Sequence, residues 1–227
     1  MTVKIITPYV FENEIKGHKQ QFWEYDVYYE RDAASIGCDL MFQKMWKQFP
    51  DDDIFILHAD MAPHHDGWFE EVLEYVEKYP EAGMFGCLLL YPAKNESDEY
   101  FVQCAGGKFT DDKPDHFGSG LILENKQAFK QELETDTGQY DTTRSVAWTT
   151  FGGCYLRREF INSVGDFDPS FEWTYNRDVD YCLSGRQNGF DIYQIPVRLF
   201  HHESRDTKRI RNDNKSAMES RNLERLQ

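Results

Sequence analysis

Short apolar runs alternate with longer amphipathic stretches over the first ninety residues, and this alternation predicts a parallel sheet covered by helices. Strands are predicted at residues 3–7, 25–30, 54–57 and 83–91. Helices are predicted at residues 12–22, at 38–49, where apolar residues recur every three or four positions, and at 69–76. The run 54–57 is apolar throughout, as in strands buried on both faces, so it is expected near the centre of the sheet. Residues 51–53, three aspartates, are expected to form a solvated turn before it.

The pattern weakens between residues 92 and 150, where glycines punctuate short polar segments and one strand is expected at 120–123. The regular hydrophobic pattern returns at 148–156. A helix is predicted at 157–164, and another is predicted to start at Asp178 and end near Gly189. A last strand is predicted at 192–200, near a sheet edge, because Pro196 has no backbone N–H to donate. Residues 206–227 are highly charged and are expected to form a surface tail or lid on a single compact domain of residues 1–205.

Composition excludes several classes of protein. The formal net charge of −15 argues against binding to nucleic acid or to an anionic membrane surface. No apolar stretch approaches the length of a transmembrane segment, and the N-terminus enters a strand pattern at once, so no signal peptide is expected. The five cysteines are odd in number and sit mostly in apolar segments, which favours reduced thiols and a cytoplasmic location.

Side chains that bind metals or protons follow the predicted strands. His58 and Asp60 come directly after the run 54–57, at the strand end where open α/β sheets bind ligands. Carboxylates bind hard divalent cations, and imidazoles complete sites for transition metals. The alternative is that Asp60 only caps a loop. His201 and His202 end the last strand; because side chains alternate across a strand, only one of them can face such a site.

Asp178 lies in the first turn of its predicted helix, on the same face as Cys182 and therefore towards the sheet, whereas Asp180 points more to solvent. A carboxylate on the buried side costs desolvation unless something uses its charge. Capping of the helix is the plain alternative to a catalytic role.

Three segments resemble the family 2 glycosyltransferases with the GT-A fold, especially the rhamnosyltransferase-like branch. The first is the strand ending in HAD, followed by Pro63, Gly67 and Trp68 and then a helix. The second reads FGGCYLRREFINSVGDFDPSF and the third RDVDYCLSGRQNGFDIYQIPVRLFHH. Together they cover roughly half of the chain in the family's order, which is more specific than any single motif.

The resemblance implies a GT-A fold: an α/β domain with a mostly parallel central sheet flanked by helices. Residues 1–95 would be its nucleotide-sugar-binding half and residues 96–205 its acceptor-side half. Asp60 would bind a divalent cation, Mn²⁺ or Mg²⁺, with His201 and His58 (His202 being the alternative to His201), and Asp178 would be the catalytic base. Lys208, Arg209 and Arg211 could close over the diphosphate. The positions implied to bind the nucleotide sugar are Thr7, Pro8, Tyr9, Arg31, Asp32, Asp60, Gly152 and Gly153.

The chain departs from the family pattern at three places. His58 replaces the first carboxylate of the usual Asp-x-Asp, Arg177 stands where an acid is common, and the segment before Asp60 is short. The implied reaction is an inverting transfer from a nucleotide-diphosphate sugar to a hydroxyl of a glycan or another acceptor. A non-catalytic nucleotide-sugar or glycan-binding domain of a larger protein is the alternative, and metal-dependent phosphoester hydrolysis is a weaker one.

Overall fold

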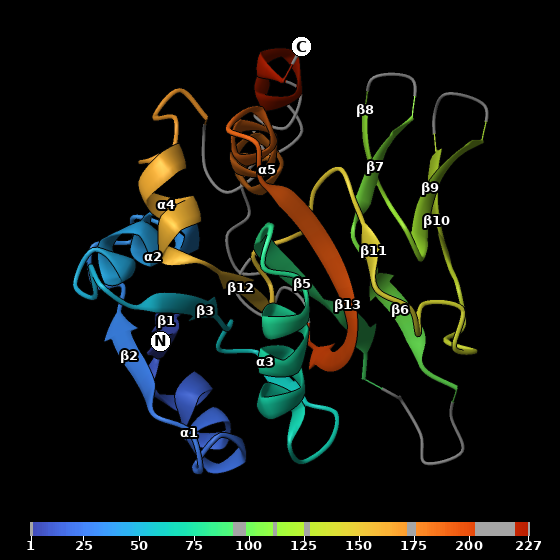
Figure 1. Cartoon of the computed structure of the whole chain (residues 1–227). Coiled ribbons are helices and arrows are strands. Elements are labelled where there is room, and N and C mark those ends of the chain that lie inside the picture. The colour runs from blue at the N-terminus through green and yellow to red at the C-terminus, as the bar shows by residue number, and fades with distance from the viewer. Residues whose placement is uncertain are drawn as a thin grey trace.

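A computed structural model describes residues 2–92, 99–110, 113–124, 128–171, 176–202 and 221–226. Of residues 110, 119–124 and 128–132 the backbone alone is described. The fold is a mixed α/β domain with one central sheet between two layers of helices (Figure 1).

The central sheet has nine strands; seven of them follow one another in a continuous order, and five of these seven run in the same direction. β13 and β5 are parallel, as are β3, β1 and β2, and β12 lies antiparallel between β5 and β3. The edge strand β11 is antiparallel to β13. This arrangement confirms the expected mostly parallel sheet. The order is β11 (Arg144–Ser145), β13 (Asp191–His201), β5 (Ala82–Tyr91), β12 (Cys154–Leu156), β3 (Asp53–Ile56), β1 (Val3–Tyr9), β2 (Val27–Arg31).

The two faces of the sheet carry different helices because side chains alternate along each strand. Ile54 and Ile56 of β3 face the cluster that contains α2 (Cys38–Trp46), α4 (Arg158–Val164) and α5 (Arg177–Gln187). Phe55, between them, faces the cluster that contains α3 (Trp68–Lys78) and Phe22, directly after α1 (Glu12–Gln21). In Figure 1, α2, α4 and α5 accordingly lie above the sheet, and α1 and α3 lie below it.

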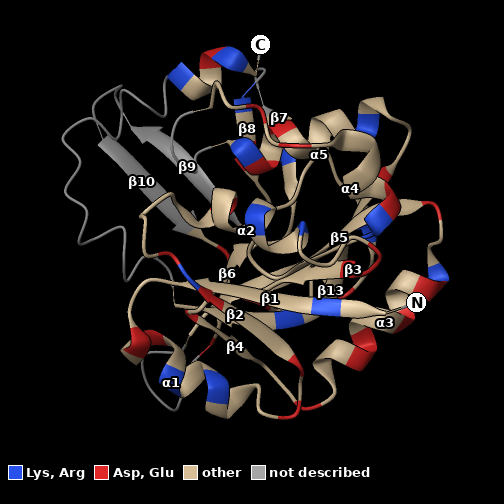
Figure 2. Cartoon of the chain, turned by 90° about the vertical axis from the view of Figure 1, so that its left-hand side faces the viewer, with Lys and Arg blue, Asp and Glu red and all other residues tan. Residues whose placement is uncertain are grey.

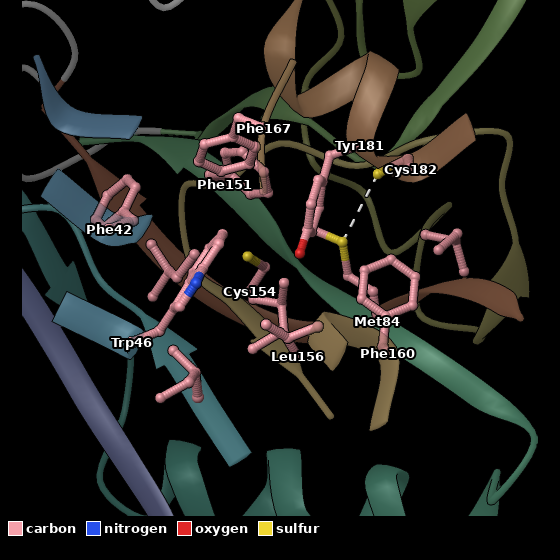
Figure 3. Packing of buried hydrophobic residues seen from close by; sticks show 14 of the residues in the cluster. Phe42, Trp46, Met84, Phe151, Cys154, Leu156, Phe160, Phe167, Tyr181 and Cys182 are labelled. Atoms are coloured by element: carbon pink, nitrogen blue, oxygen red, sulfur yellow. Dashed lines mark hydrogen bonds between the residues drawn. The ribbon is translucent and has the colours of Figure 1, made fainter. Parts of the chain in front are cut away.

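Aromatic side chains fill the core on the α2–α4–α5 side (Figure 3). Tyr181 of α5 stacks on Trp46 of α2 with ring centroids 5.7 Å apart. Phe160 of α4 packs against Gly83 and Gly185, where a Cβ atom would lie only 2.2 and 2.1 Å from its ring. Glycine at these two positions therefore lets α4 and α5 approach the sheet closely.

The region of weak pattern contains small antiparallel elements at the right of Figure 1. β6 (Phe101–Cys104) pairs with β5, and β7 (Gly107–Thr110) forms a hairpin with β8 (Lys113–His116). β9 (Ser119–Glu124) pairs with β10 (Ala128–Leu133), which confirms the strand expected at 120–123. β4 (Met61–Pro63) pairs with the end of β13.

The strand that contains Pro196 lies near an edge of the sheet, as expected, because its outer neighbour in the strand order is the two-residue edge strand β11. Pro196 is accommodated at a register shift between Ile195 and Arg198. One sequence-based expectation is wrong. Asp53 is not in a solvated turn: it is 5% exposed and belongs to β3. Its carboxylate accepts hydrogen bonds from the Tyr155 hydroxyl and from the backbone N–H of Arg158, so it joins β12 and α4 to β3.

Lys, Arg, Asp and Glu positions are spread over many elements of the domain, with acidic positions along α3 (Figure 2). All five cysteines are free thiols. Within the described ranges, no helix combines the length and the apolar character needed to cross a membrane.

Candidate metal centre and catalytic carboxylates

The ends of β3 and β13 bring His58, Asp60 and His201 together. After β3 the chain turns through residues 57–60 into β4, which pairs antiparallel with β13 so that Met61 lies opposite His201. The backbone N–H of His202 donates to the carbonyl oxygen of Asp60 at 3.0 Å. Possible ligand atoms of His58, Asp60 and His201 all lie within 4.8 Å of one another. His201, rather than His202, therefore faces the carboxylate.

A side chain that the sequence analysis missed orients His201. The Oε1 atom of Gln103, on β6, lies 2.7 Å from Nδ1 of His201. A neutral imidazole bonded in this way carries its proton on Nδ1, which leaves the Nε2 lone pair free to bind a metal. Nε2 lies 3.3 Å from Oδ1 of Asp60. A partner of this kind behind a histidine ligand is the usual arrangement in protein metal sites.

His58 is held between aromatic rings. It stacks on Phe42 at a centroid distance of 5.3 Å and meets His201 edge-on at 5.4 Å. Burial, assisted by the charge of His201, lowers the pKa of His58 to about 4. Its Nε2 atom is enclosed and has no hydrogen-bond partner in the described part of the chain. A neutral imidazole with an unpaired buried nitrogen suits coordination of a metal ion.

Asp60 supplies the negative charge of this cluster. Burial by itself would raise the pKa of Asp60, but the hydrogen bond and charge of His201, together with the charge of His58, lower it to about 2. Two ligand atoms about 2.1 Å from one ion and at right angles to each other are about 3 Å apart, close to the separation between Asp60 and His201. The three residues therefore fit a divalent ion, and two imidazoles beside one carboxylate favour a transition metal over Mg²⁺.

Asp178 lies in the first turn of α5, and Asn176, not Asp178, is the N-cap residue. One carboxylate oxygen of Asp178 accepts a hydrogen bond from the N–H of Val179 at 2.9 Å. Although part of Asp178 reaches the surface, protein atoms crowd its carboxylate, and this burial raises its pKa to about 6. Such a group is ionised at neutral pH and still basic enough to accept a proton.

A second carboxylate, Asp39, lies near Asp178 and was also missed by the sequence analysis. It occupies the first turn of α2 and is 4% exposed. Burial and, secondly, the charge of Asp178 raise the pKa of Asp39 to about 7. Arg177 offsets part of this effect, with its Nη1 atom 3.9 Å from Oδ2 of Asp39. Asp39 at the start of α2 therefore interacts electrostatically with Arg177 and Asp178 at the start of α5.

Residues of strand β6 interact both with the metal ligand His201 and with the carboxylate of Asp178. Gln103 contacts His201, and the next residue, Cys104, is close enough to Asp178 for its charge to act on the thiol. Burial and, as a smaller effect, this charge raise the pKa of Cys104 to about 12. Asp178 therefore lies close to Cys104, the neighbour in sequence of Gln103, which orients His201.

The residues expected to bind the nucleotide lie where β1 and β2 end. Thr7 is fully buried, ahead of Pro8, and its hydroxyl has no partner among the described residues. The Tyr9 hydroxyl donates to Glu12, and the Arg31 side chain donates to the carbonyl oxygen of Val10.

Asp32 has a structural task in addition to any role in binding. Its two carboxylate oxygens accept the backbone N–H groups of Ile36 and Gly37, each at 3.0 Å. These bonds shape the loop that leads into α2. Binding of a nucleotide by residues of β1, β2 and this loop stays a prediction.

Gly152 and Gly153 lie beside the chain that carries Asp60. A Cβ atom on Gly153 would approach Leu199 to 2.6 Å and Met61 to 3.2 Å, and the φ angle of Gly153 is +62°. Both features require glycine at this position. Contact of the two glycines with a donor sugar stays a prediction, and Lys208, Arg209 and Arg211 lie outside the described residues.

Comparison with known proteins gives one curated relative and a set of structural neighbours. No family model matches the chain. The O-antigen biosynthesis protein RfbC of Myxococcus xanthus is 28% identical over 163 residues, which are 70% of this chain and 11% of that protein. The chain thus spans about a tenth of its curated relative.

Among solved structures, GalNAc-T7 with UDP, GalNAc and Mn²⁺ aligns over 88% of this chain and 44% of its own, with a TM-score of 0.57 and 13% identity. A197 from STIV aligns over 88% of this chain and 81% of its own at 13% identity, but its TM-score of 0.46 supports no conclusion. The fold, the three family-like segments and the relationship to RfbC agree with one another. This chain has the GT-A fold, the fold of the glycosyltransferase GalNAc-T7.

Proposed function

We propose that this chain transfers a sugar from a nucleotide-diphosphate sugar to a hydroxyl group of an acceptor, with a divalent cation at His58, Asp60 and His201. The observation that carries the proposal is the convergence of these three side chains, from two segments more than 140 positions apart, at one sheet edge. GalNAc-T7, which shares the fold, was solved with UDP, GalNAc and Mn²⁺. We infer Mn²⁺ rather than Mg²⁺ because two of the three ligands are imidazoles.

The three metal ligands and Asp178 have different roles in the proposed reaction. His58, Asp60 and His201 hold the cation, which when bound neutralises charge on the departing diphosphate. Asp178 accepts the proton of the acceptor hydroxyl while the new bond forms between the acceptor oxygen and the anomeric carbon. The bond between that carbon and the diphosphate oxygen breaks on the opposite side, so the configuration inverts. General-base assistance of this type contributes about a hundred- to ten-thousandfold to the rate.

The proposal predicts metal-dependent binding of a nucleotide. Thermal unfolding of the chain would be followed with uridine, guanosine or thymidine diphosphate, each with and without Mn²⁺. Ligand at a hundred times its Kd adds about 2.7 kcal/mol to the free energy of unfolding, or roughly 5–10 °C for a chain of this size. We expect such a shift for at least one nucleotide, in the presence of Mn²⁺ and not with Asp60→Asn. The absence of any shift in the wild-type chain would contradict the proposal.

A second function is a non-catalytic nucleotide-sugar-binding domain. It is favoured by the single carboxylate of the metal cluster, where the family usually has two. The two functions differ in turnover: nucleotide release from bound donor sugar in the presence of acceptor glycans occurs only in the transferase.

The free thiols support the expected cytoplasmic location, which stays a prediction.

A further inference from the structure

A small polar pocket lies away from the metal cluster, between the turn after α1 and the loop from β4 to α3. Its volume is about 210 Å³, and none of His58, Asp60 and His201 lines it. In Figure 1 this region is at the bottom of the molecule, where α1 lies beside the chain that enters α3. The pocket is smaller than the ~300–1,000 Å³ typical for drug-sized ligands. It suits a single ring rather than a nucleotide.

Trp23 at the rim of this pocket is unusually exposed. Its exposed fraction is 75%, whereas the other tryptophans that the structure describes, Trp46, Trp68 and Trp148, are at most 2% exposed. Single exposed apolar side chains are common on protein surfaces, so the position of Trp23 at a pocket rim, rather than its exposure alone, points to a ligand. A flat indole face at a pocket rim suits the apolar C–H face of a sugar ring.

Trp68 in the pocket wall has an unused hydrogen-bond donor. The ring is fully buried and packs edge-on against Phe22 and Phe55, at centroid distances of 5.7 and 5.2 Å. Its Nε1–H has no partner in the described part of the chain. By contrast, the buried Trp148 donates its Nε1–H to the carbonyl oxygen of Lys108 at 3.2 Å. The indole ring of Trp68 forms part of the pocket wall next to the space that Trp23 borders.

The remaining lining residues are Tyr25, Pro63 and four polar or acidic side chains. Gln21 and His65 provide both donors and acceptors, and the carboxylates of Glu24 and Asp66 accept hydrogen bonds from hydroxyl groups. The two carboxylates repel anions, which excludes phosphates and acidic sugars. We propose that this pocket binds one neutral pyranose ring of a glycan, stacked on Trp23 and hydrogen-bonded to polar side chains of the lining.

The position of the pocket gives the bound ring a place in the proposed reaction. His65 follows Asp60 by five residues, so the two backbones are at most about 18 Å apart. A glycan of a few units could therefore bind here with one end and reach the metal cluster with the other. Its identity as an acceptor rests on the proposed function, but binding of the ring does not.

The test uses the indole N–H signals of the ¹⁵N-labelled whole chain, without metal or nucleotide. Trp23→Ala and Trp68→Phe identify their signals by removing them. Methyl glycosides of glucose, galactose, mannose, rhamnose and N-acetylglucosamine are titrated to about 50 mM, which detects millimolar binding. Methyl glucuronide is the anionic control. Phe109→Ala removes an exposed aromatic ring outside the pocket and serves as the matched control variant.

We expect at least one neutral glycoside to shift the signals of Trp23 and Trp68 saturably, and methyl glucuronide to leave them unchanged. In Trp23→Ala the shift of the Trp68 signal should require at least about tenfold more sugar, whereas Phe109→Ala should behave as wild type. No saturable shift with any neutral glycoside, unchanged affinity in Trp23→Ala, or equal binding of the glucuronide would overturn the proposal. Failure to detect sugar transfer would contradict the proposed function but leave this result unaffected.

Discussion

Gln103 and His201 are 98 positions apart in sequence, yet Oε1 of Gln103 lies 2.7 Å from Nδ1 of His201. The contact decides which nitrogen of His201 faces Asp60. It also joins β6, from the least regular part of the sequence, to the end of strand β13 in the central sheet. The metal cluster therefore depends on a residue outside all three motif segments.

Replacing Gln103 with Leu should weaken Mn²⁺ binding by about 10- to 100-fold, because His201 loses the partner that fixes its proton on Nδ1. Gln103→Glu keeps an acceptor at the same distance and is the matched control, with affinity close to wild type. Calorimetric titration of Mn²⁺ measures both. Equal affinity of wild type and the Leu variant would show that Gln103 does not orient the ligand.

Asp178→Asn should reduce kcat by at least about a hundredfold, because the amide cannot accept the acceptor's proton. The Kd of the nucleotide sugar should change less than about threefold, since Asp178 is not among the metal ligands. Rapid-quench turnover and equilibrium titration separate the two quantities. A parallel loss of binding and turnover would assign Asp178 a structural role.

The rate of transfer should depend on pH through Asp178. Because burial raises its pKa to about 6, kcat/KM should rise with pH and level off above about pH 7. Below pH 6 the carboxylate is protonated and kcat/KM should fall about tenfold per pH unit. Steady-state rates between pH 5 and 8 measure this limb. A rate independent of pH over that range would argue against Asp178 as the base.

Asp39→Asn should stabilise the protein at pH 8 and not at pH 4. The pKa of Asp39 is about 7 in the folded chain and about 4 in an unfolded one, so the folded state holds the proton more tightly. Its ionisation therefore lowers the free energy of unfolding as pH rises from about 4 to 7. Removing it should return about 1–4 kcal/mol at pH 8.

Thermal melts of the wild-type chain and Asp39→Asn at both pH values test this expectation. Asp51→Asn, at an exposed position before β3, is the matched control and should melt like wild type. If Asp39→Asn destabilises the chain at pH 8, then the ion pair with Arg177 and the hydrogen bond from Cys38 outweigh the cost of burying the charge.

The pattern of apolar and polar residues along the sequence was sufficient to predict most strands and helices of the parallel part of the sheet. The uniformly apolar strand before His58 is buried in the sheet, and the helix that starts near Asp178 exists, with Arg177 as its first residue. Positions at strand ends thus predicted His58, Asp60 and His201, which the structure brings together.

The rest depends on contacts between distant segments, which carry no local signal. Gln103 is one amide in a weakly patterned region, and Asp39 reads as an ordinary acid in the first turn of a helix. Pro196 correctly indicated a strand near the edge of the sheet, but nothing in the local sequence indicated the register shift that accommodates it. Asp53 was assigned to solvent because its partners, Tyr155 and Arg158, are about a hundred residues away.

Strand β12 has a consequence for the order in which this protein can be made. Its three residues, Cys154–Leu156, are inserted between β3 and β5, which share no hydrogen bonds with each other. A growing polypeptide therefore cannot complete the middle of its sheet until residue 156 has left the ribosome. Until then both neighbouring strands present unpaired edges, and these are the places where a nascent chain would bind a chaperone or mispair.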